Sequence, residues 1–226
     1  MIAFVSPLRV RALVSLTFLL VPFSMAQPPR FFVGGGPGIS ILSGGSGAVL
    51  GPASASISNY EPKIGKQIHI FGGWNPWEYV SVQAAWSANR NALIFNSTVG
   101  TTGFYRQRRK SAQQNLGTDF LLYFRDRKSV VRPFLSVGLN HMWFRSEPVE
   151  VTASGGALLP PPRFTDQAVG LRVAAGTDLV HRNGWGFRYA FMEHLQQRNV
   201  IGLRLTPSAD RPLMNFQHIF GVVKYF

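Results

Sequence analysis

The chain has 226 residues, no cysteine and a formal charge of +13, although only 15% of its residues are charged. The absence of cysteine excludes disulfides, thiolate metal sites and cysteine nucleophiles. Charge this sparse is unusual for a soluble nucleic-acid-binding protein, and 23 glycines with 13% aromatic residues favour strands and tight turns over helices.

The N-terminal segment has the pattern of a secretory signal peptide. Arg9 and Arg11 supply the positive charge, 12–21 is the apolar core, and small residues lead up to Ala26. A membrane anchor is the alternative, but a spanning helix needs roughly 20 apolar residues and this run is about half as long. We predict cleavage after Ala26, so that 1–26 is the signal peptide and 27–226 is one mature domain.

The first predicted strand is Arg30–Leu42, where glycines accommodate side chains that crowd a barrel interior. Gly34–Gly38 is not expected to bind phosphate, because neither Gly-Lys-Ser/Thr nor a helix pattern follows it. The next segment, Ser43–Lys63, is rich in glycine, serine, alanine and proline, and is predicted to be a long mobile loop.

Six further stretches alternate between large apolar residues and polar or small ones, as strands do when their two faces meet different surroundings. They are Lys66–Gly73, Tyr79–Ser87, Ser111–Phe124, Val131–Phe144, Asp166–Val180 and Trp185–Met192. The last stretch, Asn215–Phe226, alternates in the same way and brings the prediction to eight strands.

Long and short connections take turns between the predicted strands. The long ones are 43–63, 88–110, 145–165 and 196–212, and the short ones are 74–77, 125–129 and 182–184. Long extracellular loops and short periplasmic turns follow one another in this way in up-and-down outer-membrane barrels.

The two faces of the predicted strands differ in chemistry. Val169 and Leu171 lie on one face of their strand, and Arg172 and Asp178 lie on the other. Aromatic residues gather at both strand ends: Trp74, Trp77, Phe124, Trp185 and Phe226 near short turns, and Trp86, Trp143, Phe144 and Phe216 near long connections. Two membrane interfaces favour two such girdles, whereas a soluble lipocalin-type barrel would have an apolar lumen and a polar exterior.

The last strand also carries a family resemblance. Gly221 lies five residues before the terminal aromatic Phe226, as in the C-terminal targeting strand of bacterial outer-membrane barrels, although Lys224 stands where that family usually has a hydrophobic residue. Over its mature length the chain resembles the small OmpA/OmpX-type barrels. The resemblance implies an all-β fold, an eight-stranded antiparallel up-and-down transmembrane β-barrel in the outer membrane, inserted by the barrel-assembly machinery. A ten-stranded count stays open, because Val200–Leu205 could pair beyond the membrane.

An eight-stranded barrel has an interior just wide enough for its own side chains, and charges there need partners. The expected inward charges are Asp119, Arg172, Asp178 and Arg188. A three-residue turn that ends with Gly184 in the left-handed region would place Asp178 opposite Arg188, so we predict an interior salt-bridge network. The alternatives are a position in water at the rim and a gated solute path through these charges.

No catalytic, cofactor or metal site is predicted. Barrels that resemble the lipid A deacylases have a histidine two residues before a serine, but here Phe71, Trp143, Asn183, Gln196 and Phe220 follow the histidines at that spacing. Glu193 and His194 are adjacent, so a strand would point them to opposite faces. No histidine pair has a convincing metal-ligand spacing.

A basic run, Arg106, Arg108, Arg109 and Lys110, lies in one of the long connections. It is either a solvated loop or a contact for lipopolysaccharide phosphates, for which arginine is well shaped. Loss of the two signal-peptide arginines would reduce the formal charge from +13 to +11, which favours attraction to an anionic outer leaflet. Nucleic acid is not an expected partner of an exported chain.

The sequence therefore predicts a non-enzymatic outer-membrane barrel with a polar packed lumen, whose long loops serve a structural, adhesion or binding role. The extracellular ligand is unknown. A narrow pore for small solutes is the second hypothesis, which conductance would test. A lipid A-modifying enzyme is the third, which mass spectrometry of lipid A would test.

Overall fold

The computed structural model describes residues 30–42, 46–50, 56–99, 103–154, 163–196, 203–205 and 215–226. The predicted signal peptide lies outside these residues. The described residues include no helix long and apolar enough to cross a bilayer. They form eleven strands: β1 (Arg30–Leu42), β2 (Ser46–Leu50), β3 (Ser56–Pro62), β4 (Gly65–Asn75), β5 (Val80–Val99), β6 (Gly103–Tyr123), β7 (Val131–Ser154), β8 (Phe164–Val180), β9 (Trp185–Gln196), β10 (Leu203–Leu205) and β11 (Asn215–Tyr225).

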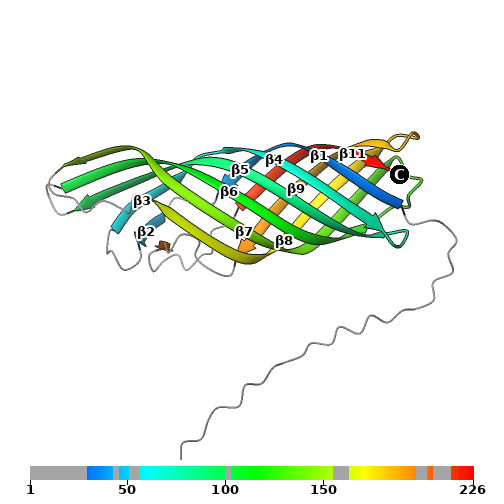
Figure 1. Ribbon diagram of the computed structural model, residues 1–226, viewed down its shortest axis with the longest axis horizontal. Helices are drawn as coiled ribbons and strands as arrows, with labels where there is room; N and C mark the ends of the chain where they lie inside the picture. The colour runs from blue at the N-terminus through cyan, green and yellow to red at the C-terminus, as the bar shows by residue number, and fades with distance from the viewer. Residues whose placement is uncertain are drawn as a thin grey trace, which may run out of the picture.

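Eight of these strands close into a ring in the order β1-β4-β5-β6-β7-β8-β9-β11, and every neighbouring pair is antiparallel (Figure 1). Pairing of β1 with β11, for example Phe32 with Tyr225, completes the ring. Closure leaves no unpaired strand edge around the barrel wall. The prediction of an eight-stranded antiparallel up-and-down barrel is confirmed.

The stagger of the strands sets their tilt. A row of paired residues that leaves β1 at Phe31 passes through Trp74 and the other six strands, and it returns to β1 at Ile41, ten residues further along. Eight strands with this stagger tilt by about 40° from the barrel axis. Ten residues of a strand therefore rise about 25 Å along the axis.

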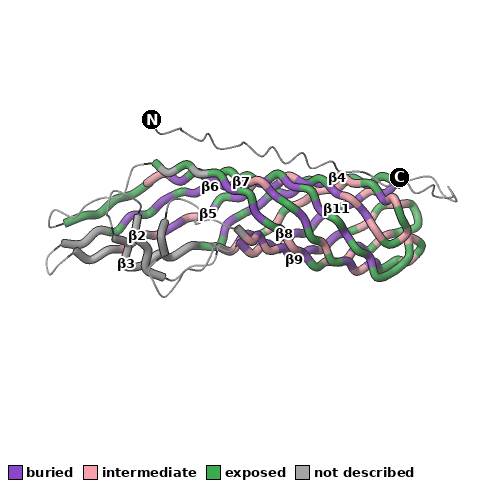
Figure 2. The backbone as a smooth tube through the Cα atoms, turned by 90° about the horizontal axis from the view of Figure 1, so that it is seen from below, coloured by how far each residue is buried: buried purple, intermediate pink, exposed green. Residues whose placement is uncertain are grey.

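The barrel wall is apolar outside and largely polar inside. Val169 and Leu171 are exposed, whereas Arg172 and Asp178 on the same strand are fully buried. Buried and exposed residues alternate along the strands in Figure 2. The predicted faces are therefore confirmed for the strands of the ring.

Aromatic residues lie near both ends of the apolar band. Exposed rings at the short-turn end are Trp74, Trp77, Phe124, Trp185 and Phe226. Trp143 is exposed near the other end, but its neighbour Phe144 is only 2% exposed and lies inside the barrel. The assignment of Phe144 to the outer girdle was wrong, because adjacent residues of a strand point to opposite faces.

Three predicted long connections, 43–63, 88–110 and 145–165, are largely strand. Strand β5 continues beyond the apolar band to Val99, and β6 begins outside the band at Gly103. Strand β7 continues beyond the band to Ser154. The predicted loop 43–63 contains β2 and β3, which pair with each other, while β3 also pairs with β5 and β10 with β2 (Figure 1). The outer parts of β5 and β6 carry polar residues on both faces, for example Arg90 and Arg108 outward and Asn91 and Arg109 inward, so the sequence shows no apolar alternation there. The short β10 joins this outer sheet and does not enlarge the ring.

Candidate functional site

A buried ion pair joins β8 and β9 inside the barrel. Arg188 donates from Nε to Asp178 Oδ1 at 2.6 Å and from Nη2 to Oδ2 at 2.7 Å. The two residues are direct cross-strand partners. The turn sets this register, since Gly184 has a φ of 81° and His181 N donates to Trp185 O at 2.7 Å. Glycine adopts such a φ at no steric cost.

A second buried ion pair spans three strands. Arg172 of β8 donates from Nε to Asp119 Oδ1 on β6 at 2.7 Å, and its Nη2 donates to Oδ2. Gly138 of β7 lies directly between the two residues. A Cβ atom at position 138 would lie 2.3 Å from Asp119 Oδ1. The glycine therefore leaves the space in which this bidentate pair forms.

Gln83 connects the two ion pairs. Its Oε1 accepts from Arg188 Nη1 at 2.6 Å, and its Nε2 donates to Asp119 Oδ2 at 3.3 Å. The hydroxyl of Tyr123 donates to Asp178 Oδ2 at 3.1 Å, and that of Tyr225 donates to the same oxygen. The structure thus places all four predicted interior charges in one buried network, in which each charge has an opposite partner.

Aromatic rings surround Arg188 in the short-turn half of the barrel. Its guanidinium carbon lies 4.3 Å from the ring centre of Phe71, 5.0 Å from that of Phe134 and 5.3 Å from that of Phe32. Other apolar side chains fill the same half: Ala85, Leu121, Ala174, Ala190, Met192, Ile219 and Val223. In this half the lumen is therefore mixed, with apolar side chains packed around the buried ion pair.

Each of these rings packs over a glycine on the neighbouring strand. Phe71 pairs with Gly34, Phe32 with Gly73, and Phe134 with Gly176. A Cβ at the three glycines would lie 2.5, 2.3 and 2.6 Å from the paired ring, respectively. A narrow barrel can hold the rings only because the facing residue has no side chain. Inward glycines opposite inward aromatics were the sequence signal for this packing.

The long-loop half of the lumen contains a network of neutral side chains that the sequence analysis did not single out. Ser40 donates to Asn215 at 2.8 Å, and Asn215 donates to Gln113 at 2.7 Å. Asn89 donates to Gln113 and to Asn91. The recurrence of asparagine, glutamine and serine at inward positions was the available signal.

The basic run is divided between the two faces of β6. Arg109 is fully buried, donating from Nε to Ser146 Oγ at 3.0 Å and from Nη1 to Gln107 Oε1 at 2.7 Å. Arg106, Arg108 and Lys110 are exposed on the outer face. The solvated-loop interpretation was wrong because β6 continues through the run, and Arg109 is not available to an external ligand.

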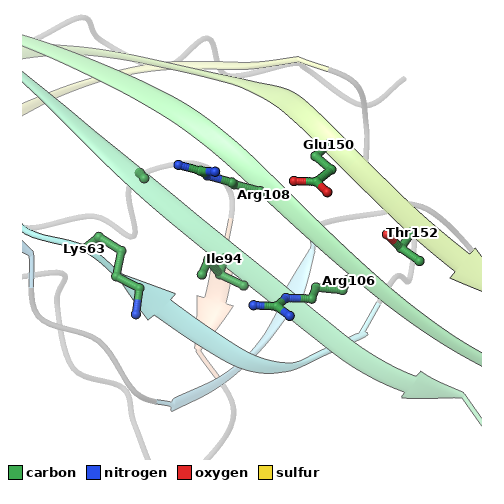
Figure 3. Close-up of a pocket in the computed structure, with 7 residues that line it drawn as sticks. Lys63, Ile94, Arg106, Arg108, Glu150 and Thr152 are labelled. Atoms are coloured by element: carbon green, nitrogen blue, oxygen red, sulfur yellow. The ribbon is translucent and has the colours of Figure 1, made fainter.

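Arg106 and Arg108 lie in a groove of about 340 Å³ on the outer face, beside Lys63 and Ile94 on one side and Glu150 and Thr152 on the other (Figure 3). A second groove of about 690 Å³ adjoins it and is also lined by Arg90, Lys110, Arg145 and Glu147. The participation of β5 and β7 in these grooves was not predicted.

Glu147 is an exposed acceptor on this outer surface. It accepts from Arg145 Nε at 2.9 Å and from Arg163 Nε at 2.8 Å. The hydrogen bonds from Arg145, and to a lesser extent those from Arg163, hold the pKa of Glu147 below its usual range. Glu147 therefore stays ionised at neutral pH and partly neutralises these two arginines.

The histidines offer no assembled catalytic or metal site within the described ranges. His194 is fully buried inside the barrel, whereas Glu193 is partly exposed on the outer face. The two side chains point in opposite directions, as their adjacency on β9 requires. No group of three or more potential metal ligands occurs among the described residues.

Comparison with known proteins shows which solved structures share this architecture. No family model and no curated protein sequence matches the chain. Neisserial surface protein A has a TM-score of 0.55 at 13% identity over 87% of this chain and 97% of that chain. A major outer-membrane protein of Thermus thermophilus has a TM-score of 0.55 at 9% identity, over 88% and 100% of the two chains. OprG of Pseudomonas aeruginosa has a TM-score of 0.54 at 11% identity, over 87% and 95%.

The chain has the fold of the small OmpA/OmpX-type outer-membrane β-barrels. Identities of this size establish the fold alone. In this OmpA/OmpX-type fold, β11 is the strand that closes the ring against β1.

The two residues of the predicted insertion signal lie on β11 and just after it. Phe226 is 68% exposed, and its backbone N–H donates to Phe31 O at 2.9 Å. Gly221 faces inward, where a Cβ would lie 3.2 Å from Gly35 O. The closing strand therefore presents an aromatic side chain outward and a residue without a side chain at a crowded inner position.

Proposed function

We propose that this protein is a non-enzymatic outer-membrane protein that crosses the bilayer as a closed barrel and presents its long-loop end to the outside. The dimensions of the outer apolar band carry this proposal. On β8 the band runs from Val169 to Leu179, ten residue steps that rise about 25 Å at this tilt. That height matches the apolar band of outer-membrane barrels.

The distribution of polarity supports lipid as the surrounding medium. Among the described residues, thirty large apolar side chains are exposed, while the four charged groups of the ion-pair network are buried. Soluble monomers rarely expose a contiguous apolar surface larger than a few hundred Å². The hydrocarbon of a bilayer would cover this apolar surface, whereas in water it would stay exposed at a cost in free energy.

The filled interior favours a closed barrel over a pore. Phe32, Phe71 and Phe134 pack around Arg188 in the short-turn half, and the bidentate pair with Asp178 holds the guanidinium there. Displacing these groups would leave charges buried without partners, which is costly. A structural or binding role therefore fits the interior better than solute transport.

The outer sheet supplies the surface for a binding role. Strands β5, β6 and β7 extend beyond the apolar band, and β3, β2 and β10 add to β5 on one side (Figure 1). In the proposed orientation this sheet lies outside the cell. The features of β11 at Gly221 and Phe226 would serve recognition by the barrel-assembly machinery.

Cysteine labelling tests the proposal cleanly, because the natural chain has no cysteine. Thr152→Cys introduces a thiol on the exposed end of β7, and Lys128→Cys introduces one at an exposed short turn. A membrane-impermeant maleimide should label Cys at position 152 on intact cells, and Cys at position 128 only after the outer membrane is permeabilised. Labelling of both positions on intact cells, or of neither after permeabilisation, would contradict the proposed placement.

A further inference from the structure

The outer face of β4 to β7 and its flanking residues carry a concentrated positive charge, here called the basic surface. Its exposed cations are Lys63, Lys66, Arg90, Arg106, Arg108, Lys110, Arg145 and Arg163. Among the described side chains, two carboxylates, Glu147 and Glu150, lie between these eight cations, so the described charges sum to +6. The basic surface therefore holds a large share of the excess charge of the chain.

The basic surface begins where the apolar band ends. Arg145 lies two residues beyond the exposed Trp143 on β7, and Lys66 lies two residues beyond the exposed Ile68 on β4. On β6 the cations continue from Lys110 to Arg106, away from the band. With a rise of about 2.5 Å per residue, the basic surface extends from the band edge to roughly 20 Å beyond it.

Among the residues whose side chains the structure describes, this charge lies on one side of the barrel. Near the long-loop end of β1 and β11, the described outward residues are Ile39, Ile41 and Phe216, none of which is charged. Outward residues Thr165 and Gln167 of β8 are also uncharged. A uniform attraction to an anionic membrane needs no such concentration on four neighbouring strands, so the arrangement favours a localised ligand.

Four cations that line the two grooves have no acidic partner among the described residues. Glu147 binds Arg145 and Arg163. Across the ranges that the structure describes, the side chains of Arg90, Arg106, Arg108 and Lys110 form no ion pair. They line the two adjoining grooves, which share Arg108 (Figure 3). These grooves therefore combine unneutralised positive charge with space for an anionic group.

We propose that the basic surface binds the phosphate groups of a phosphorylated glycolipid of the outer leaflet, a lipid A-type molecule, chiefly through Arg90, Arg108 and Lys110. This proposal rests on the proposed function, because it requires the long-loop end to face the outer leaflet. Arginine can bind phosphate oxygens in a bidentate manner. The acyl chains of the same molecule would lie against the apolar band directly below, for example at Ile68 and Trp143, which a soluble phosphate would not contact.

The test compares two triple variants with equal charge change. Arg90→Ser, Arg108→Ser and Lys110→Ser together alter the basic surface. The control, Arg125→Ser, Lys128→Ser and Arg182→Ser, removes three exposed cations at the short-turn end. Each protein is folded in non-ionic detergent micelles, its barrel is verified by heat-dependent electrophoretic mobility, and its binding of fluorescent bisphosphorylated lipid A is titrated.

The control should bind lipid A like the natural protein, and the basic-surface variant about 100-fold more weakly, since each surface cation contributes about fivefold. The difference should vanish with dephosphorylated lipid A, and a phosphorylated sugar without acyl chains should compete poorly. Equal affinity of the two triple variants would overturn the proposal, as would equally tight binding of the acyl-free sugar. Failure of the proposed function can be told apart from failure of this proposal. In that case the maleimide labelling would contradict the placement of the long-loop end outside the cell, whatever the affinity for lipid A.

Discussion

Arg188 and Gln83 share a 2.6 Å hydrogen bond that joins the two buried ion pairs of the barrel into one network. Gln83 is 4% exposed, and its amide also donates to Asp119. A neutral side chain on β5 thereby connects charges from β6, β8 and β9. The stability of the barrel should depend on this glutamine as well as on the ions.

Gln83→Leu should lower the free energy of unfolding by about 1–3 kcal/mol, because it takes the acceptor from buried Arg188 Nη1 and removes one of the two hydrogen bonds to Asp119 Oδ2. Reversible urea unfolding in lipid vesicles, followed by tryptophan fluorescence, measures the change. Gln114→Leu is the matched control, since Gln114 is exposed on the outer face and its replacement should change stability by less than about 0.5 kcal/mol. Equal effects of the two replacements would show that the connection is unimportant.

Removal of one member of the Asp178–Arg188 pair should be more damaging than removal of both. Asp178→Leu alone leaves a buried cation and should cost about 3–5 kcal/mol. The double variant Asp178→Leu with Arg188→Met should be more stable than the sum of the two single effects predicts, which a double-mutant cycle in the same unfolding assay measures. Strict additivity would contradict direct pairing.

The exchanged pair, Asp178→Arg with Arg188→Asp, should recover only part of the lost stability. Three ring faces surround the natural guanidinium, and they favour a cation over a carboxylate. The free energy of unfolding of the exchanged variant should therefore lie between that of the natural protein and that of Arg188→Asp alone. Full recovery would show that the rings do not discriminate between charges.

Two adjacent glycines of β4 should respond differently to a methyl group. At Gly73 a Cβ would lie 2.3 Å from the Phe32 ring and 2.6 Å from Val82 O, whereas at Gly72 the nearest atom would lie 3.7 Å away. Gly73→Ala should therefore cost about 1–3 kcal/mol through overpacking, and Gly72→Ala should be nearly neutral. The unfolding assay compares them directly, and similar costs would contradict the inward packing of Phe32.

The packed interior of the barrel should not conduct ions. The natural protein, inserted into planar bilayers, should give no steady single-channel current at moderate voltage, because rings and paired charges fill the short-turn half. The insertion itself is verified by protease protection in vesicles made from the same lipids. A steady, reproducible conductance would support the pore hypothesis in place of the closed barrel.

The sequence predicts the barrel wall well, because its strands meet two different media and alternate accordingly. Even the pairing of Asp178 with Arg188 follows locally, from the turn that ends at Gly184. The outer extensions are different: in the described parts, Asn89–Ile94 and Arg106–Gln113, polar residues lie on both faces of β5 and β6, so nothing in the pattern separates strand from loop. The inward position of Arg109 follows from the alternation of side chains along a strand, but only once β6 is known to extend through this residue.

Long-range relationships were also beyond sequence reasoning. The pairing of Asp119 with Arg172 depends on the registers of three strands and on the absence of a side chain at Gly138. The basic surface similarly depends on register, which places Lys66, Arg90 and Arg145 in one row across β4, β5 and β7. In the sequence, Lys66, Arg90 and Arg145 each stand as an isolated cation on their strand.

The central claim is that the outer apolar face contacts hydrocarbon, and spin labelling of single cysteines in vesicle-inserted protein tests it most directly. Labels at Val137→Cys and Val173→Cys, in the middle of the band, should be accessible to oxygen and inaccessible to a water-soluble nickel chelate. A label at Arg182→Cys, in the exposed short turn, should show the reverse. Chelate accessibility at positions 137 and 173 equal to that at position 182 would contradict the account.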